Sequence, residues 1–219
     1  MVFKENKSRS FLAMTYLVLF IIFEILVMTG NNFLTSFDKN IQNLITPIVN
    51  SVNTSFFVAV SFLGSPVVSL LLAIFIAILI YSKKRRADGI WILLTYLGGD
   101  VLSFIVKQDV RRPRPTDKLV PDTGFSFPSG HIFGLTLLVL IVIYMVLPYV
   151  KNQETRFVLG ILAIIWLLVV GFARVYLRGH FASDIFGSIL LAGTWWKGCE
   201  LLYLRYFEKV SQYLNLKID

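Results

Sequence analysis

The chain has 219 residues, of which 56% are hydrophobic and 15% aromatic, and its mean hydropathy is +0.73. This composition excludes an ordinary soluble domain and is typical of a membrane protein. A single cysteine, Cys199, excludes an internal disulfide framework and a thiolate metal cluster within one chain. The formal net charge of +8 could suggest a nucleic-acid partner, but in so apolar a chain it indicates cytoplasmic anchoring charges and a site for an anionic ligand.

The first predicted membrane helix runs from Phe11 to Thr29, because roughly 20 apolar residues suffice to cross the hydrocarbon core. Its basic flank resembles a signal peptide, but no small-residue cleavage site follows, so we expect the helix to be retained. Residues Asn31 to Thr54 are too polar to span, since Asp38 and Lys39 interrupt them. Apolar residues nevertheless recur there at helical spacing, which predicts an amphipathic helix at the membrane interface with a kink at Pro47.

Five further apolar segments predict the remaining crossings. The first of them, Phe56 to Tyr81, is punctuated by Gly64-Ser65-Pro66, and we expect its crossing to start near Pro66, which suits a first helical turn. The later crossings are Ile90 to Val106, Ile132 to Val150, Phe157 to Ala173 and Phe181 to about Tyr206. The sequence therefore predicts an all-α polytopic protein, with six transmembrane helices and an interfacial helix between the first and the second. One membrane-embedded domain, residues 1–219, accounts for the whole chain.

Basic residues are distributed unequally between the two predicted membrane faces. Six crossings bring both termini to one face, whose basic residues are Lys4, Lys7, Arg9, Lys83 to Arg86, Lys151, Arg156, Arg205, Lys209 and Lys217. The positive-inside rule identifies this face as cytoplasmic. The opposite face carries Lys39 and a second basic group, consisting of Lys107, Arg111, Arg112, Arg114, Lys118, Arg174 and Arg178. Because this group breaks the rule, we interpret it as the site of an anionic ligand at the extracytoplasmic face.

Polar residues at the extracytoplasmic helix ends form three clusters that the predicted topology brings together. The clusters are Lys107 with Arg114-Pro115, then Phe127 to His131, then Arg174 with His180 and Asp184. Arg114 and Arg174 can give bidentate hydrogen bonds to phosphate oxygens, and Lys107 adds a compact charge. Ser129 is the expected N-cap of the fourth crossing, and the N–H groups around Gly130 form an anion site at a positive helix end.

The chain has only two histidines, and both flank this phosphate site. His180 and Asp184 are four residues apart on a predicted helix, so the carboxylate can bind one imidazole nitrogen and leave the other as a nucleophile. His131 is then free to donate a proton to the leaving oxygen. A single His or Arg at a helix end is more often a cap or an interfacial anchor, but three clusters converging on one face favour a catalytic site.

Together these residues resemble the three-part signature of the type 2 phosphatidic acid phosphatase superfamily. The match is Lys107-(six residues)-Arg114-Pro115, Pro128-Ser129-Gly130-His131 and Arg174-(five residues)-His180-(three residues)-Asp184, all within residues 107–184. The resemblance implies that His180 forms a phosphohistidine, that His131 is the general acid and that Asp184 orients the nucleophile. It also implies that phosphate is bound, without a metal or another cofactor, by Lys107, Arg114, Ser129, Gly130 and Arg174. The family usually has Ser before the third-motif arginine, and Ala173 at this position removes one expected hydroxyl contact.

The resemblance implies a phosphatase that acts on lipid phosphates in the cell membrane. Phosphatidylglycerol phosphate is the favoured substrate, as in bacterial phosphatidylglycerophosphatase-like members, with phosphatidic acid as a similar one. Undecaprenyl diphosphate is the alternative. An anion or lipid transporter is the alternative from another class, and it predicts charges distributed along the bilayer depth.

Three further cations lie near the signature. Arg111, Arg112 and Arg178 could contact a second phosphate or the lipid surface, or be solvated loop charges. The expected partners are the lipid substrate and membrane lipids, and no nucleic acid.

Overall fold

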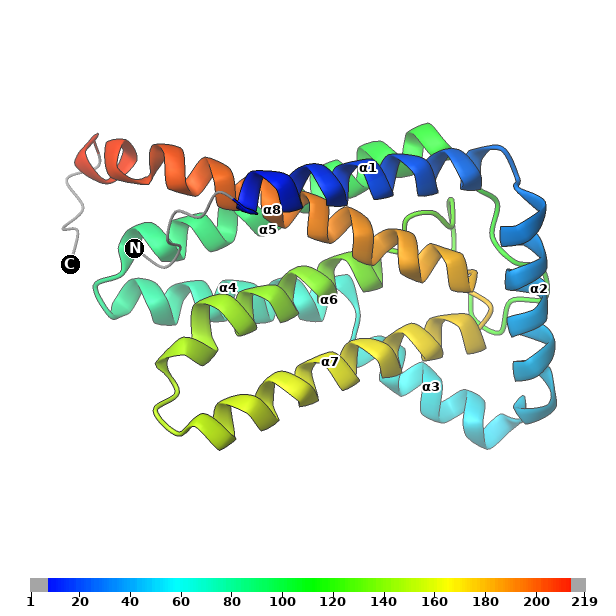
Figure 1. Ribbon diagram of the computed structural model, residues 1–219. Helices are drawn as coiled ribbons and strands as arrows, with labels where there is room; N and C mark the ends of the chain where they lie inside the picture. Colours follow the sequence, from blue (N-terminus) through cyan, green and yellow to red (C-terminus); the bar gives the residue numbers. More distant parts are fainter. Residues whose placement is uncertain (1–7, 214–219) are drawn as a thin grey trace.

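The computed structural model describes the backbone of residues 8–213 and the side chains of residues 8–206. These residues form helices joined by loops, which confirms the all-α prediction (Figure 1). The helices are α1 (Ser8–Met28), α2 (Asn32–Ile45), α3 (Ser51–Leu63), α4 (Pro66–Ser82), α5 (Arg86–Val110), α6 (Gly130–Ile141), α7 (Gln153–Tyr176) and α8 (Ala182–Tyr213). Of the basic residues used to predict the orientation, Lys4, Lys7, Lys217 and the side chain of Lys209 lie outside the described residues.

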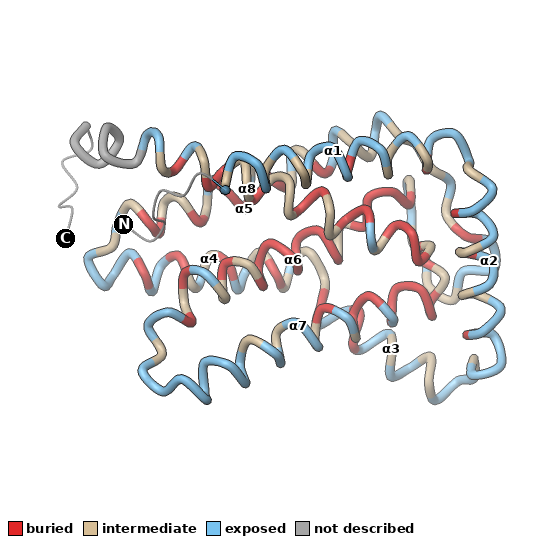
Figure 2. Tube along the Cα trace, in the orientation of Figure 1, coloured by how far each residue is buried: buried red, intermediate tan, exposed pale blue. Residues whose placement is uncertain are grey.

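The long helices run along one axis, and α2 lies across one end of the bundle (Figure 1). The loop between α5 and α6 and the start of α8 lie at this end, whereas the α4–α5 and α6–α7 connections lie at the opposite end. Helix α6 is the central helix, because nine of its twelve residues are buried and it packs against α4, α5, α7 and α8 (Figure 2). The start of α6 is therefore held from several sides.

The outward faces of the bundle are apolar. Large hydrophobic side chains such as Phe11, Phe75, Phe104 and Leu168 are exposed on four different helices. Within the described residues, five segments are long and apolar enough to cross a membrane: Ser8–Met28, Ser51–Ser82, Arg86–Val110, Gly130–Tyr149 and Gln153–Tyr176. Exposure of so much apolar surface to water would be unfavourable, so the chain is a multi-pass membrane protein.

The sixth predicted crossing, α8, is not among these five segments. Its 32 residues are long enough to cross, but they include Asp184, Lys197 and Glu200, which make it more polar than the others. Two of these charges are paired, because Lys197 Nζ lies 2.7 Å from Glu200 Oε2, and Glu200 also pairs with Arg9 of α1. Five of the six predicted crossings are thus found as apolar helices.

The apolar segment that contains the second predicted crossing is longer than the predicted spanning part. Pro66 does open α4, and the Ser65 hydroxyl accepts a hydrogen bond from the Val68 N–H at 3.3 Å. The apolar segment, however, already starts at Ser51, because α3 precedes α4 with only Gly64 and Ser65 between them. A side chain at Gly64 would collide with Val170, so glycine lets the break between α3 and α4 approach α7 closely.

The predicted amphipathic helix is α2, followed by a 3-10 turn at Thr46–Ile48 that contains Pro47. The predicted segment extended to Thr54, but its last residues belong to the next helix. Asn50 caps this helix, α3, by accepting a hydrogen bond from the Asn53 N–H at 2.9 Å. The buried residues of α2 include Asp38, which is only 2% exposed. The carboxylate that makes this segment too polar to span thus points into the protein.

The fourth crossing is not one regular helix. Helix α6 ends at Ile141, a π-helical segment covers Val142–Val146, and a 3-10 turn covers Leu147–Tyr149. Pro148 explains the change, because proline has no N–H to donate to the preceding turn and its ring displaces a carbonyl there. The irregular part lies far from the end that carries the predicted site residues.

Close packing of α1 on α8 depends on Gly193. A Cβ there would lie 2.6 Å from the Tyr16 ring of α1. We expect Gly193→Ala to destabilise the protein by roughly 1–3 kcal/mol, as overpacking does. Thermal unfolding in detergent micelles measures the loss.

Gly198 of the same helix is the matched control, because a Cβ there would meet nothing within 4 Å. We expect Gly198→Ala to leave the stability unchanged or to raise it by about 0.5–1 kcal/mol, since alanine favours helix. Equal melting temperatures for the two variants would contradict this account of the α1–α8 contact.

Candidate active site

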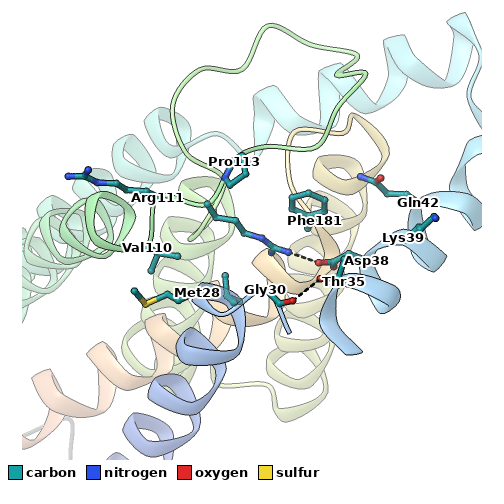
Figure 3. Close-up of a pocket in the computed structure, with 12 residues that line it drawn as sticks. Met28, Gly30, Thr35, Asp38, Lys39, Gln42, Val110, Arg111, Pro113 and Phe181 are labelled. Carbon is teal, nitrogen blue, oxygen red and sulfur yellow. Dashed lines mark hydrogen bonds and ion pairs between the residues drawn. The ribbon is translucent and has the colours of Figure 1, made fainter. Parts of the chain in front are cut away.

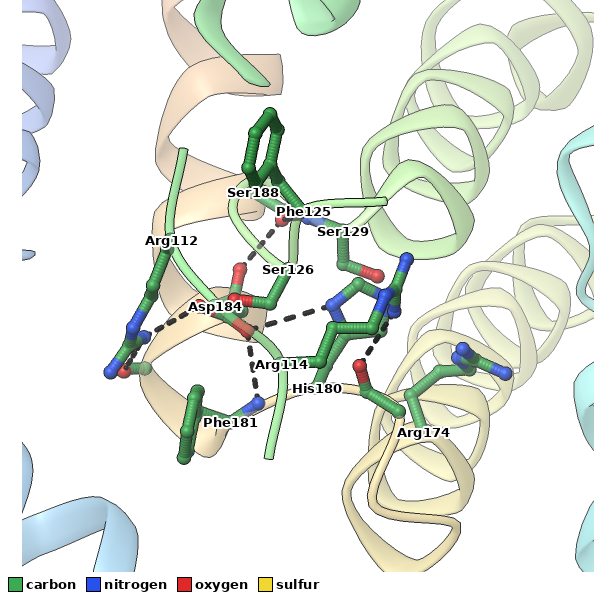
Figure 4. Close-up of polar contacts among 12 residues, drawn as sticks. Arg112, Arg114, Phe125, Ser126, Ser129, Arg174, His180, Phe181, Asp184 and Ser188 are labelled. Carbon is green, nitrogen blue, oxygen red and sulfur yellow. Dashed lines mark hydrogen bonds and ion pairs between the residues drawn. The ribbon is translucent and has the colours of Figure 1, made fainter. Parts of the chain in front are cut away.

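The structure brings the three predicted clusters together at the end of the bundle that α2 covers (Figure 4). Lys107 lies in the last turn of α5 and Arg174 in the last turn of α7, which confirms the prediction that they end the third and fifth helices. His131 lies in the first turn of α6, within electrostatic range of Arg174 and His180. All the predicted residues therefore come from helix ends, from the loop that joins α5 to α6 or, for His180, from the short connection between α7 and α8.

His180 lies between an arginine and a carboxylate. Its Nε2 is 3.2 Å from Arg114 Nη1, and its Nδ1 is 3.5 Å from Asp184 Oδ2. Nδ1 has no hydrogen-bond partner within the described part of the chain, so at 3.5 Å the Asp184 carboxylate is close to Nδ1 without a formed hydrogen bond. Such contacts are often long without substrate and shorten when it binds. With the proton on Nδ1, the Nε2 lone pair faces Arg114.

Burial lowers the pKa of His180 from 6.5 to about 4, although the neighbouring Asp184 carboxylate acts in the opposite direction. The charges of Arg174 and Arg114 lower this pKa further. His180 is thus neutral at pH 7, which is the form that a nucleophilic imidazole requires.

Asp184 is fully buried in the first turn of α8, and both of its oxygens are bound. Oδ1 accepts a hydrogen bond from Arg112 Nη1 at 2.5 Å, and Oδ2 accepts one from the Phe181 N–H at 2.9 Å. His180 itself precedes α8 rather than lying on it, so the predicted shared helix face is wrong. The two side chains still meet, because the turn at Phe181 folds His180 back towards the helix.

Asp122, which the sequence analysis did not single out, lies between the two predicted phosphate-binding arginines. Its Oδ2 forms an ion pair with Arg174 Nη2 and lies 3.6 Å from Arg114 Nη1. Burial alone would raise the pKa of Asp122, but Arg174 and Arg114 outweigh it and lower the pKa. A side chain at Gly179 would collide with this pair. A carboxylate thus binds the same guanidinium groups that a phosphate would need.

Ser129 occupies the predicted N-cap position of α6, but its side chain makes no capping hydrogen bond. Its N–H donates to Ser188 Oγ at 2.7 Å, and Ser188 Oγ in turn donates to the Asp184 carbonyl at 2.6 Å. Ser188, which the sequence analysis missed, therefore joins the second cluster to the third. The Ser129 hydroxyl is buried and unpartnered within the described residues, which leaves it available to a ligand.

Lys107 and Arg114 bind backbone carbonyl groups of two connections between helices. Lys107 Nζ donates to the Phe125 carbonyl of the α5–α6 loop at 3.1 Å, and Arg114 Nη1 donates to the Gly179 carbonyl of the α7–α8 connection at 2.6 Å. The α5–α6 loop is anchored by Phe127, whose buried ring stacks on Phe20 of α1 with 6.4 Å between the centroids. This loop thus binds Lys107 and carries Arg114, whose guanidinium contacts His180.

Arg174, which follows Ala173, binds a hydroxyl from another helix. Ala173 itself is fully buried and belongs to the apolar core. Arg174 Nη1 donates to Ser61 Oγ of α3 at 2.9 Å. The break between α3 and α4 brings Ser61 to this position, which the sequence alone did not indicate.

The three additional cations have different surroundings. Arg111 is exposed and donates to the Gln108 carbonyl, and Arg178 lies 3.6 Å from Asp117 near the end of α2. Arg112, in contrast, is mostly buried and contacts Asp184. Within residues 8–206, no group of three or more His, Cys, Asp or Glu side chains is placed to hold a metal ion.

The His180 pKa can be measured directly, because the chain has only two histidines. In a His131→Gln variant labelled with ¹⁵N-histidine, the one remaining imidazole is His180. We expect its NMR titration midpoint at about 4 in detergent. A midpoint near 6.5 would show that His180 is solvated rather than buried beside the arginines.

Asp122 competes with any anion for Arg114 and Arg174. We expect Asp122→Asn to bind inorganic phosphate and vanadate more tightly by roughly 3- to 10-fold, since tenfold corresponds to ~1.4 kcal/mol. Calorimetric titration of the purified protein measures the affinity. Asp117→Asn is the matched control, because this carboxylate lies in the same loop but is 80% exposed. Equal or weaker binding by Asp122→Asn would contradict this role.

Comparisons with known proteins agree with the geometry. The family model of the PAP2 superfamily matches residues 88–208, which contain all the predicted site residues. Phosphatidylglycerophosphatase B of Bacillus subtilis is 29% identical over 151 residues, which cover 66% of this chain and 70% of that protein. An undecaprenyl-diphosphatase of the same organism is 24% identical over 143 residues, which cover 63% and 67% of the two chains.

The fold is also similar to that of a solved membrane protein. The crystal structure of a transmembrane PAP2 type phosphatidylglycerolphosphate phosphatase from Bacillus subtilis aligns with a TM-score of 0.73 and 24% sequence identity. The alignment covers 90% of this chain and 96% of that one. Since the family model matches more than half of the residues, the chain belongs to the PAP2 superfamily and is a multi-pass membrane phosphatase.

Proposed function

We propose that this chain hydrolyses lipid phosphates at the extracytoplasmic membrane face through a phosphohistidine on His180. The observation that carries the proposal is the environment of this imidazole. It is buried and neutral, with Asp184 beside Nδ1 and the Arg114 guanidinium 3.2 Å from Nε2. A nucleophile next to a group that binds the electrophile's oxygens is the arrangement that phosphoryl transfer requires.

In the first step, the phosphate displaces Asp122 and binds Arg114, Arg174 and Lys107. The Ser129 hydroxyl and the N–H groups at the start of α6 bind its remaining oxygens. His180 Nε2 then attacks phosphorus, and the bond from phosphorus to the lipid oxygen breaks. His131 donates a proton to this oxygen, so the lipid leaves as an alcohol and phosphohistidine remains.

In the second step, a water molecule attacks the phosphohistidine. His131, now deprotonated, takes a proton from the water, and the phosphorus–nitrogen bond breaks. His180 recovers its lone pair and inorganic phosphate leaves. Asp184 balances the positive charge that develops on the His180 ring in both steps, as the carboxylate does in other nucleophile–carboxylate pairs. Every step uses side chains of this chain, and none is assigned to a metal.

We assign α8 as the sixth crossing of a single membrane-embedded domain and α2 as an interfacial helix. Two of the charges that make α8 more polar are paired, which lowers their cost in a membrane. The α4–α5 connection, with Lys83 to Arg86, lies at the end opposite the site. The positive-inside rule makes that end cytoplasmic and the site extracytoplasmic.

An apolar cavity of about 430 Å³ supports a lipid as the substrate. It lies between α2, α7 and α8, and its lining includes Ile45, Phe172 and Ile185. The helices that line it also carry Arg174, at the end of α7, and Asp184, at the start of α8, although neither side chain is part of the lining. We assign this cavity to a hydrocarbon chain of the substrate, because its lining offers few polar groups to a headgroup.

Phosphatidylglycerol phosphate is the substrate that we favour. A relative that is 29% identical is named phosphatidylglycerophosphatase B. Undecaprenyl diphosphate is the second candidate, because another relative is named an undecaprenyl-diphosphatase. The cations converge on one site rather than following the bilayer depth, which favours a phosphatase over the transporter alternative.

The proposal predicts phosphate release by the purified protein in detergent and EDTA. We expect turnover of phosphatidylglycerol phosphate that vanadate inhibits, with a lower rate on undecaprenyl diphosphate. Because His180 forms the bond to phosphorus, His180→Ala should reduce kcat at least about 10³-fold. His131→Ala should reduce it by roughly 10²- to 10⁴-fold.

Arg111→Ala serves as the control, because Arg111 is exposed and its guanidinium donates to the Gln108 carbonyl of its own helix end. The proposal is lost if neither lipid releases phosphate, or if His180→Ala keeps full activity. A higher kcat/KM for undecaprenyl diphosphate would leave the mechanism standing and reverse the order of the two substrates.

A further inference from the structure

Arg112 lies between two buried carboxylates. Its Nη1 donates to Asp184 Oδ1 at 2.5 Å and its Nη2 donates to Asp38 Oδ2 at 2.7 Å. The guanidinium also donates to Ser183 Oγ at 2.7 Å and lies over the Phe181 ring, 4.2 Å from its centroid. Arg112 therefore contacts the carboxylate beside the proposed nucleophile, from the side opposite to His180.

Asp38 ties α2 to the start of α8. Its Oδ1 accepts a hydrogen bond from the Ser183 N–H at 2.8 Å, and its Oδ2 accepts one from Ser183 Oγ at 2.6 Å. Asp38 is 2% exposed and Ser183 is 1% exposed, so water does not compete with these contacts. One carboxylate of the helix that lies across the bundle thus binds both Arg112 and the residue next to Asp184.

The charges explain why these contacts affect Asp184. An ionised carboxylate that is fully buried needs a positive partner, and removal of the partner leaves an uncompensated charge. The planar guanidinium binds two carboxylates in fixed directions, which a lysine cannot reproduce. Arg112 thereby fixes Asp184 through Oδ1 and leaves Oδ2 facing His180 Nδ1.

We propose that Arg112 and Asp38 are positioning residues for the nucleophile, and that they make the docking of α2 a condition for the reaction. This inference rests on the proposed function, since it assigns a partner to Asp184 in that mechanism. Neither residue is expected to touch the phosphate. Both act by holding Asp184, and α2 acts through Asp38.

The surroundings of the pair support this separation from the phosphate site. Arg112, Asp38 and Phe181 line a cavity of about 520 Å³ between the end of α1, α2 and the end of α5 (Figure 3). His180 and Asp184 are not part of its lining. The Arg112 guanidinium therefore lies between this cavity and Asp184. Substitution of Arg112 can thus alter the position of Asp184 without removing a phosphate contact.

The test compares Arg112→Lys and Asp38→Asn with the wild type, using phosphatidylglycerol phosphate. We expect kcat to fall by roughly 10- to 100-fold, as losses of outer-shell partners typically do. KM and the dissociation constant for vanadate should stay within about 2-fold, because the phosphate contacts are kept. Arg111→Lys and Asp109→Asn are the controls, since both residues are exposed neighbours with the same charges, and they should retain wild-type kcat.

A double-mutant cycle with Asp184→Asn distinguishes positioning from a general structural effect. If Arg112 acts through Asp184, Arg112→Lys should change kcat by less than about 2-fold in the Asp184→Asn background. The same 10- to 100-fold fall in both backgrounds, or a loss that appears mainly in vanadate affinity, would overturn the inference. Should Arg112→Lys not fold, as thermal unfolding would reveal, Asp38→Asn carries the same cycle.

Failure of this inference differs from failure of the proposed function. If the wild type releases no phosphate, both the proposed function and the positioning role are wrong. With an active wild type, full kcat in Arg112→Lys and Asp38→Asn overturns only the positioning role and leaves the His180 mechanism intact.

Discussion

The cost of burying ionised groups shapes the end of the bundle that holds the site. Asp184, Asp38 and Arg174 are each less than 4% exposed, and an isolated charge at such a position would cost several kcal/mol. Each is therefore paired: Arg112 serves the first two, and Asp122 serves Arg174. His180, which is as deeply buried, avoids the cost by remaining neutral.

The packing of the helices positions the residues of this network of charges. Helix α6 is buried on most sides, so the segment that opens it is rigid, and Ser188 attaches this segment to α8. The break between α3 and α4 lets Ser61 reach Arg174, and α2 delivers Asp38. Residues from widely separated parts of the chain thus bind the arginines and the carboxylate that surround His180. In the proposed mechanism, this preorganisation allows a lipid phosphate to react without a metal.

Sequence reasoning found the residues that have a chemical signature. Two histidines, a basic group that breaks the positive-inside rule, and glycine and proline at helix ends are visible without a structure. Sequence reasoning missed Asp122 and Ser61, whose type and spacing are ordinary, and it read Asp38 only as a polar interruption of an apolar segment. It also predicted that Ser129 caps α6, but the Ser129 hydroxyl makes no capping hydrogen bond and only its backbone N–H is bound, by Ser188 Oγ.

The sequence by itself determined the membrane class, the all-α fold and the identity of the candidate site residues, because hydropathy and motif spacing are local properties of the chain. Only the tertiary structure decided which groups are partners. Arg111 and Arg112 are adjacent and chemically identical, yet one is exposed and the other joins Asp38 to Asp184. That difference arises from how α2, α5 and α8 pack, and long-range packing leaves no signal in the spacing of residues along one chain.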